Sequence, residues 1–129
     1  MRNVGGTPDV IGIWKTRRSD FIKGEIVVSA EIKLENSPAA LITAFGQACA
    51  YKIFSHKVYL VIPKNSSEPD KSRIESLCQI FGIGLILFDA SESENPQFEI
   101  RVRAIKHEPD LDYVNKYLRI LEENRIFTF

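Results

Sequence analysis

Two short stretches of this chain carry residue types that suit metal-assisted hydrolysis. Asp9 follows Thr7-Pro8, and Glu31-Ile32-Lys33 begins twenty-two residues later. Each stretch belongs to an apolar, strand-like run, and a turn-rich segment joins the two runs. Side chains alternate along a strand, so Glu31 and Lys33 should point to the same face. If the two runs pair as a hairpin, Asp9 lies beside them, and two carboxylates and an amine meet at one place.

Hard cations such as Mg²⁺ bind one or two carboxylates together with water and phosphate oxygens. The backbone carbonyl of Ile32 can join Asp9 and Glu31 as a ligand, because it lies between two residues of the site. A cation held there lowers the pKa of a bound water and offsets charge that develops on a phosphate. Lys33 would orient or activate that water, or neutralise the phosphate. The set suits hydrolysis of a phosphodiester bond.

The surrounding sequence predicts strands and helices that hold these residues. The first two strands, about Asp9 to Trp14 and Glu25 to Leu34, are followed by a helix that Ser37-Pro38 begins and that runs to about Phe54. In the second strand, Val28, Ala30, Ile32 and Leu34 should form the packed face, and Ser29, Glu31, Lys33 and Glu35 the open working face. The later elements are two apolar strands, an alternating strand and two helices, at 57–63, 83–88, 98–103, about 70–81 and 110–123. The order β-β-α-β-α-β-β-α predicts an α/β domain with a mixed sheet flanked by helices.

With Pro8-Asp9, Glu31-Ile32-Lys33 and this order of elements, the sequence resembles the PD-(D/E)xK nuclease superfamily, which has the restriction-endonuclease-like fold. The resemblance covers residues 7–63 best. It implies that Asp9 and Glu31 are ligands of Mg²⁺ or Mn²⁺, the cation whose shell the Ile32 carbonyl can join. It also implies that Lys33 is the catalytic lysine and that the substrate is DNA.

The helix after the lysine strand carries Gln47 and Tyr51, spaced as in the Gln-x-x-x-Tyr motif of RecB-type nucleases. The resemblance implies that Gln47 belongs to the catalytic set, and that Tyr51, with Thr43 on the same helical stripe, binds the substrate backbone or supports Lys33. Tyr51 as a plain packing residue is the alternative. Arg17 and Arg18, between the first two strands, are candidate phosphate contacts, and a solvated turn is the alternative for them.

Composition places the chain among single-domain globular proteins. Its 129 residues are 44% hydrophobic and 26% charged, and none of its apolar runs is long enough for a membrane span. No signal peptide is recognisable at the N-terminus, so a cytoplasmic protein with reduced cysteines is expected. Residues 1–64 carry nine basic and five acidic residues, and residues 65–129 carry eight and twelve, so the half with Asp9 and Glu31 is basic. His56 and His107 lack a metal-ligand spacing and are expected at the surface.

The chain departs from the superfamily pattern in two ways. Only eight residues precede Asp9, too few for the first core helix of the fold, so that helix should be missing. A homodimer or a partner subunit covering the N-terminal side of the sheet is therefore expected. A DNA-reading module is also not recognisable, which favours structure- or end-dependent cleavage, or a cutting domain of a larger enzyme. The alternatives are a non-catalytic nucleic-acid-binding or assembly module that keeps the fold, and an RNA-directed nuclease.

Overall fold

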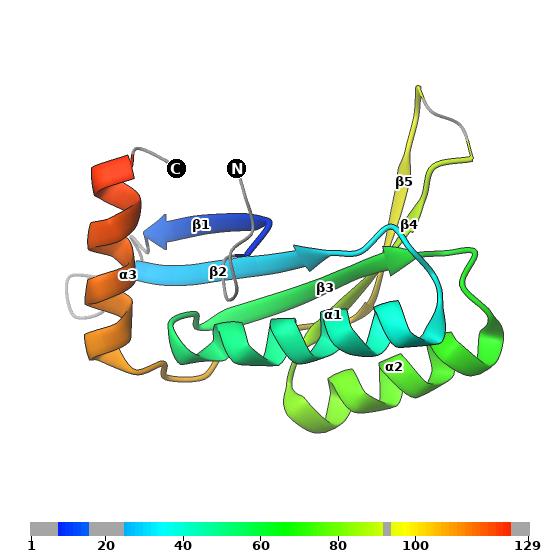
Figure 1. The fold of residues 1–129 in the computed structure, drawn as a ribbon, viewed down its shortest axis with the longest axis horizontal. Helices are drawn as coiled ribbons and strands as arrows, with labels where there is room; N and C mark the ends of the chain where they lie inside the picture. The colour runs from blue at the N-terminus through cyan, green and yellow to red at the C-terminus, as the bar shows by residue number, and fades with distance from the viewer. Residues whose placement is uncertain (1–7, 16–24, 92–93, 125–129) are drawn as a thin grey trace.

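In the described part of this chain, a five-stranded mixed sheet and three helices form an α/β structure (Figure 1). The computed structural model describes residues 8–15, 25–91 and 94–124. The strands are β1 (Val10–Lys15), β2 (Glu25–Ile32), β3 (Lys57–Pro63), β4 (Gly84–Asp89) and β5 (Gln97–Val102). The helices are α1 (Pro38–Ala50), α2 (Glu68–Phe81) and α3 (Leu111–Asn124), with a short 3₁₀ turn, η1 (Tyr51–Ile53), directly after α1.

The strands lie in the sheet in the same order as in the sequence. β1 pairs with β2, and β4 with β5, in antiparallel fashion, whereas the β2–β3 and β3–β4 pairs are parallel. The α/β class and the mixed sheet predicted from the sequence are therefore confirmed. The narrower identification with the restriction-endonuclease-like fold stays a prediction.

Local sequence signals set the ends of α1 and α2. The Ser37 hydroxyl accepts the N–H of Ala40 at 3.2 Å, and Ser67 caps α2 in the same way through Asp70. A proline follows each cap within the first two helical positions. Gly82 ends α2 with a φ of 74°, a left-handed conformation that suits glycine.

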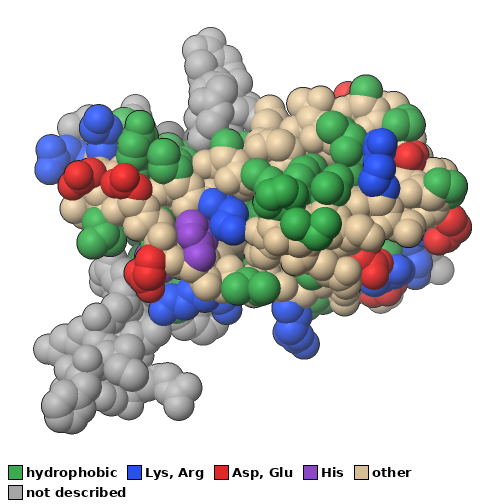
Figure 2. All heavy atoms as spheres, turned by 90° about the horizontal axis from the view of Figure 1, so that it is seen from below, with side chains coloured by type: hydrophobic (Ala, Val, Ile, Leu, Met, Phe, Trp, Pro, Cys, Tyr) green, Lys and Arg blue, Asp and Glu red, His purple; other side chains and the backbone are tan. Residues whose placement is uncertain are grey.

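Both crossover helices, α1 and α2, pack on one face of the sheet and contact each other (Figure 1). Right-handed crossovers produce this arrangement when successive parallel strands are added in one direction. The core between these helices and the sheet consists of fully buried apolar residues, among them Leu41, Tyr51, Leu60, Ile62, Ile74, Leu85 and Leu87. α3 lies at the end of the sheet where β2 begins, and its Val114 is buried. Viewed from the side of α1 and α2, exposed apolar side chains gather between charged ones (Figure 2).

The prediction of which face of β2 is packed was wrong. Val27, Ser29 and Glu31 are buried on the face that α1 covers, whereas Ile32 is 38% exposed and Leu34 69% exposed. The polar residues Ser29 and Glu31 tolerate burial because each has a hydrogen-bond partner in the segment that follows α1. Glu31 therefore occupies the interior side of the sheet and not an open one.

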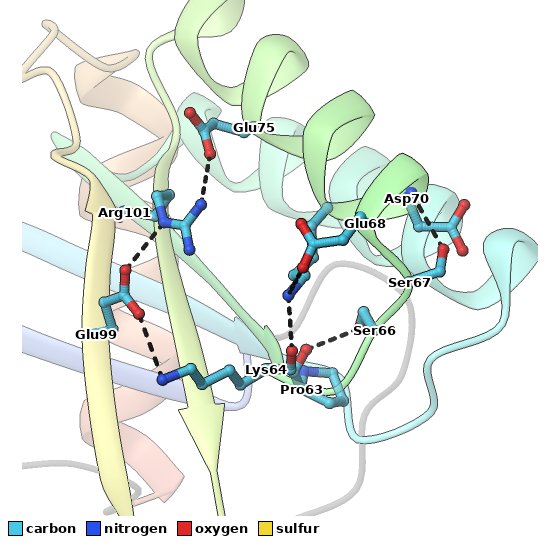
Figure 3. Close-up of polar contacts among 10 residues, drawn as sticks. Pro63, Lys64, Ser66, Ser67, Glu68, Asp70, Glu75, Glu99 and Arg101 are labelled. Carbon is cyan, nitrogen blue, oxygen red and sulfur yellow. Dashed lines mark hydrogen bonds and ion pairs between the residues drawn. The ribbon is translucent and has the colours of Figure 1, made fainter.

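The edge strand β5 contains a β-bulge and a row of ion pairs. Its register with β4 shifts between Ile86–Ile100 and Leu85–Val102, which leaves Arg101 as the extra residue. The Arg101 guanidinium contacts Glu75 of α2 at 3.2 Å and Glu99 of β5 at 3.1 Å (Figure 3). Lys64 lies 3.8 Å from Glu99, so the end of β3 is tied to the same edge.

Candidate functional site

Asp9 is attached to the end of β2 by two hydrogen bonds. Its backbone N–H donates to the carbonyl of Ala30 at 3.1 Å, and its Oδ2 accepts the N–H of Ile32 at 2.8 Å. Because Val10 pairs with Ala30 in the antiparallel register, the next step places Asp9 opposite Glu31. The hairpin predicted to bring the two acids together is therefore present, and they are adjacent.

The carbonyl of Ile32 is directed to the same side of β2 as Asp9. In an extended strand the N–H and C=O of one residue point to the same side, and the N–H of Ile32 is bound to Asp9. The N–H of the next residue, Lys33, donates to Val61 of β3 at 2.9 Å, which is the opposite side. Asp9, Glu31 and the Ile32 carbonyl therefore gather where β2 ends, on its β1 side.

Glu31 is a buried carboxyl, only 3% exposed. Its Oε1 accepts a hydrogen bond of 2.7 Å from the Tyr51 hydroxyl. Burial raises the pKa of Glu31, and the charge of Asp9 adds to that rise, whereas the Tyr51 hydrogen bond and the Lys33 ammonium oppose it. Two neighbouring acids in a partly desolvated place repel each other, and a divalent cation would relieve that repulsion.

The donor set fits a hard cation with few protein ligands. The described part of the chain contains no cluster of three or more acidic, histidine or cysteine side chains. Asp9 and Glu31, with one backbone carbonyl, are the oxygen ligands typical of Mg²⁺, which keeps several waters and needs no complete protein cage. The site residues thus suit Mg²⁺ or Mn²⁺ better than a softer metal such as Zn²⁺.

The residues predicted on α1 lie in different surroundings. Thr43 is exposed, Gln47 is half-buried, and Tyr51 is fully buried at the start of η1. Tyr51 is the residue of the three that contacts the acidic pair, through Glu31. Arg17 and Arg18 lie outside the described residues.

The contacts between β2 and the segment after α1 were not predicted from the sequence. Ser55 shares a hydrogen bond with Ser29, and Nδ1 of His56 accepts the N–H of Val27 at 3.0 Å. The expected surface position of His56 was wrong, because the side chain is buried, and burial lowers its pKa. Together with Tyr51, these residues attach residues 51–56 to the face of β2 that carries Glu31. A histidine next to a helix end is the only sequence signal of this contact.

The raised pKa of Glu31 predicts a pH-dependent cost to stability in the absence of metal. The folded chain holds the Glu31 proton more tightly than the unfolded chain, whose usual value is 4.5, so this contribution is full below that pH and is lost as the pH rises through the raised value. Glu31→Gln should therefore stabilise the protein at pH 8 by on the order of 1 kcal/mol, since the neutral amide avoids burial of a charge. Urea unfolding in EDTA at pH 5 and pH 8 measures this. A difference between variant and wild type that does not grow with pH would contradict it.

Two general features bear on the setting of the site. None of the helices in the described residues is long and apolar enough to cross a membrane. Comparisons with protein-family models, with curated protein sequences and with solved structures found no match to this chain.

Proposed function

We propose that this chain is a metal-dependent nuclease that hydrolyses phosphodiester bonds in DNA. The observation that carries the proposal is the pairing of buried Glu31 with Asp9 at the end of β2, where the Ile32 carbonyl faces the same side. The resemblance of Pro8-Asp9 and Glu31-Ile32-Lys33 to the PD-(D/E)xK superfamily supports DNA as the substrate. The basic charge of residues 1–64 is compatible with a polyanion.

Each residue of the site has a chemical task in this proposal. Asp9 and Glu31 supply anionic oxygens for Mg²⁺ or Mn²⁺, and Ile32 supplies a neutral one. When bound, the cation supplies Lewis-acid chemistry, acidifying water and stabilising charge on the phosphate. Lys33 follows Glu31 by two residues and is close enough to lower the pKa of that carboxyl, so its ammonium lies within electrostatic reach of a phosphate at the same place. In this proposal the half-buried Gln47 assists Lys33 or contacts the substrate.

A calorimetric titration of the purified chain with Mn²⁺ tests the metal site. Wild-type protein should release or absorb heat with a stoichiometry of about one ion, as two carboxylates and a carbonyl can hold one hard cation. Glu31→Gln should abolish the signal, because the amide removes one of the two charges. Glu75→Gln is the matched control: this glutamate of α2 pairs with Arg101 and should leave Mn²⁺ binding unchanged.

The same protein is then incubated with Mg²⁺ or Mn²⁺ and with linear, nicked and single-stranded DNA. Cleavage that requires the metal and disappears in Glu31→Gln supports the nuclease. Absence of Mn²⁺ binding would instead favour a non-catalytic module that keeps the fold. Cleavage of RNA in place of DNA would correct the substrate and leave the chemistry intact.

A further inference from the structure

Tyr51 and Glu31 form a buried pair beside the proposed metal site. The Tyr51 side chain is 0% exposed and Glu31 is 3% exposed, and the phenol donates to Oε1 of the carboxylate at 2.7 Å. A phenol so enclosed is placed to hold the carboxylate and not to touch a nucleic acid. Within the described residues, the other carboxylate oxygen, Oε2, accepts no hydrogen bond.

We propose that Tyr51 is a positioning residue that occupies Oε1 of Glu31 and leaves Oε2 as the oxygen available to a divalent cation. This inference rests on the proposed metal-dependent function. It differs from a substrate-binding role for Tyr51, because its effect reaches the reaction only through Glu31.

Aromatic packing holds the Tyr51 ring in place. Its centroid lies 6.0 Å from that of Phe54, and Phe54 stacks on Tyr117 of α3 with centroids 4.1 Å apart. Two backbone hydrogen bonds join the residues just before α3 to the segment that contains Tyr51 and Phe54. They run from the N–H of His107 to the carbonyl of His56 and from the N–H of Asp110 to the carbonyl of Ile53, each at 2.9 Å. Burial and the Glu31 carboxylate also raise the pKa of Tyr51, so the phenol keeps its proton and remains a donor.

Occupation of one carboxylate oxygen has a consequence for ion preference. Ca²⁺ has six to eight ligands and often binds carboxylates in bidentate fashion, whereas the smaller Mg²⁺ and Mn²⁺ favour octahedral sites with single oxygens. Because Oε1 of Glu31 already accepts the Tyr51 hydrogen bond, Oε2 is the oxygen that a cation meets without a competing donor among the described residues. Tyr51 therefore favours the smaller ions over Ca²⁺ at this site.

Tyr51→Phe, which removes one hydroxyl, tests the role. Mn²⁺ and Ca²⁺ are titrated separately by calorimetry, without DNA, into wild type and variant. Loss of the hydrogen bond that orients a ligand typically weakens metal binding by about 10-fold or more, so Mn²⁺ affinity should fall by roughly that factor. Ca²⁺ affinity should fall less or rise, so that the ratio of Mn²⁺ to Ca²⁺ affinity decreases. A merely structural role for Tyr51 would lower thermal stability without changing this ratio.

Tyr59→Phe is the matched control. Tyr59 pairs with Ala30 in the β2–β3 register, so it lies on the sheet face opposite Glu31, and its loss of a hydroxyl should change neither affinity. Wild-type protein that binds no Mn²⁺ would overturn the metal site and this inference together. Wild type that binds Mn²⁺, with an unchanged ion ratio in Tyr51→Phe, would overturn the role of Tyr51 alone.

A second variant covers the case in which Tyr51→Phe does not fold. Phe54→Leu keeps the Tyr51 hydroxyl and removes the ring that packs between Tyr51 and Tyr117. Folding is checked by circular dichroism, and the same titrations follow. The ion ratio should shift in the same direction by a smaller factor, and a folded Phe54→Leu protein with the wild-type ratio would contradict the inference.

Discussion

Lys33→Ala should reduce metal-dependent DNA cleavage by roughly 10³-fold while the protein still binds Mn²⁺. A positioned acid, base or cation at the reacting phosphate contributes a factor of that order. Metal binding should persist or tighten, because Asp9 and Glu31 remain and a cation that would repel the metal is gone. Single-turnover cleavage of a labelled duplex, at saturating Mg²⁺, measures the rate.

Lys57→Ala is the control for loss of a lysine from the sheet. Lys57 begins β3 and pairs with Val28, at the opposite end of the shared ladder from Ile32 and Lys33, and its removal should leave the rate within about twofold. Lys33→Arg separates two tasks, because arginine keeps the charge but does not give up a proton near neutral pH. If Lys33→Arg keeps substantial activity, the task of Lys33 is charge neutralisation. If Lys33→Arg is inactive, the task of Lys33 is proton transfer. Wild-type rates in Lys33→Ala would remove Lys33 from the catalytic set.

Gly84→Ala should destabilise the fold by about 2 to 3 kcal/mol, the cost of an extra methyl group in a place with no room for it. Gly84 begins β4 opposite Tyr59, whose ring covers it. A Cβ there would meet that ring and would lie 2.8 Å from the backbone nitrogen of Ala104. The backbone cannot move aside as a flexible side chain can, so the strand pair must shift. Guanidinium unfolding of variant and wild type gives the difference in free energy.

Gly46→Ala is the same substitution in open space. Gly46 lies inside α1, and among the described residues no atom beyond the adjoining helix backbone lies within 4 Å of the position that its Cβ would take. Alanine in a helix interior is favoured over glycine by about 0.5 to 1 kcal/mol, so this variant should be more stable than wild type. The two substitutions should therefore have effects of opposite sign. Equal effects would mean that the enclosure of Gly84 does not limit stability.

The elements of the fold were largely predictable, because their signals are local. Ser37-Pro38 marks the start of α1, Gly82 the end of α2, and the apolar run 57–63 is β3 at the predicted bounds. The extended β2 was predicted two residues too long, since Leu34 carries the apolar alternation beyond the last strand residue, Ile32. Whether a partner covers the sheet, as a homodimer would, stays a prediction.

The buried face of β2 could not be predicted, because it depends on the crossovers and not on the strand. Apolar Val28, Ala30 and Ile32 alternate with polar Ser29 and Glu31, a pattern typical of a strand with its apolar side inward. The crossover helix α1 nevertheless covers the polar side of β2. Burial of the polar side chains Ser29 and Glu31 is compensated by hydrogen bonds from residues distant in sequence. These partners are Ser55 and Tyr51.

The pairing of Asp9 with Glu31 could be predicted from the sequence, whereas the contacts that hold Glu31 in place could not. The adjacency of Asp9 and Glu31 follows from a hairpin with a two-residue side-chain period, which sequence spacing reveals. The contact of Tyr51 with Glu31 arises where the helix has already ended, so helical spacing from Gln47 did not predict it. Phe54, His56 and Tyr117 hold that segment through contacts that the sequence pattern does not encode.

The bulge at Arg101 limits the growth of the sheet beyond β5. An incoming strand, from another molecule or from a misfolded chain, needs a regular row of backbone donors and acceptors, and the extra residue interrupts that row. It would also have to settle beside Glu99 and Arg101, whose charges are engaged with Lys64 and Glu75 and are costly to desolvate. At this edge the molecule should therefore resist templated aggregation, even though Phe98 and Ile100 are more than half exposed there, at 63% and 52%.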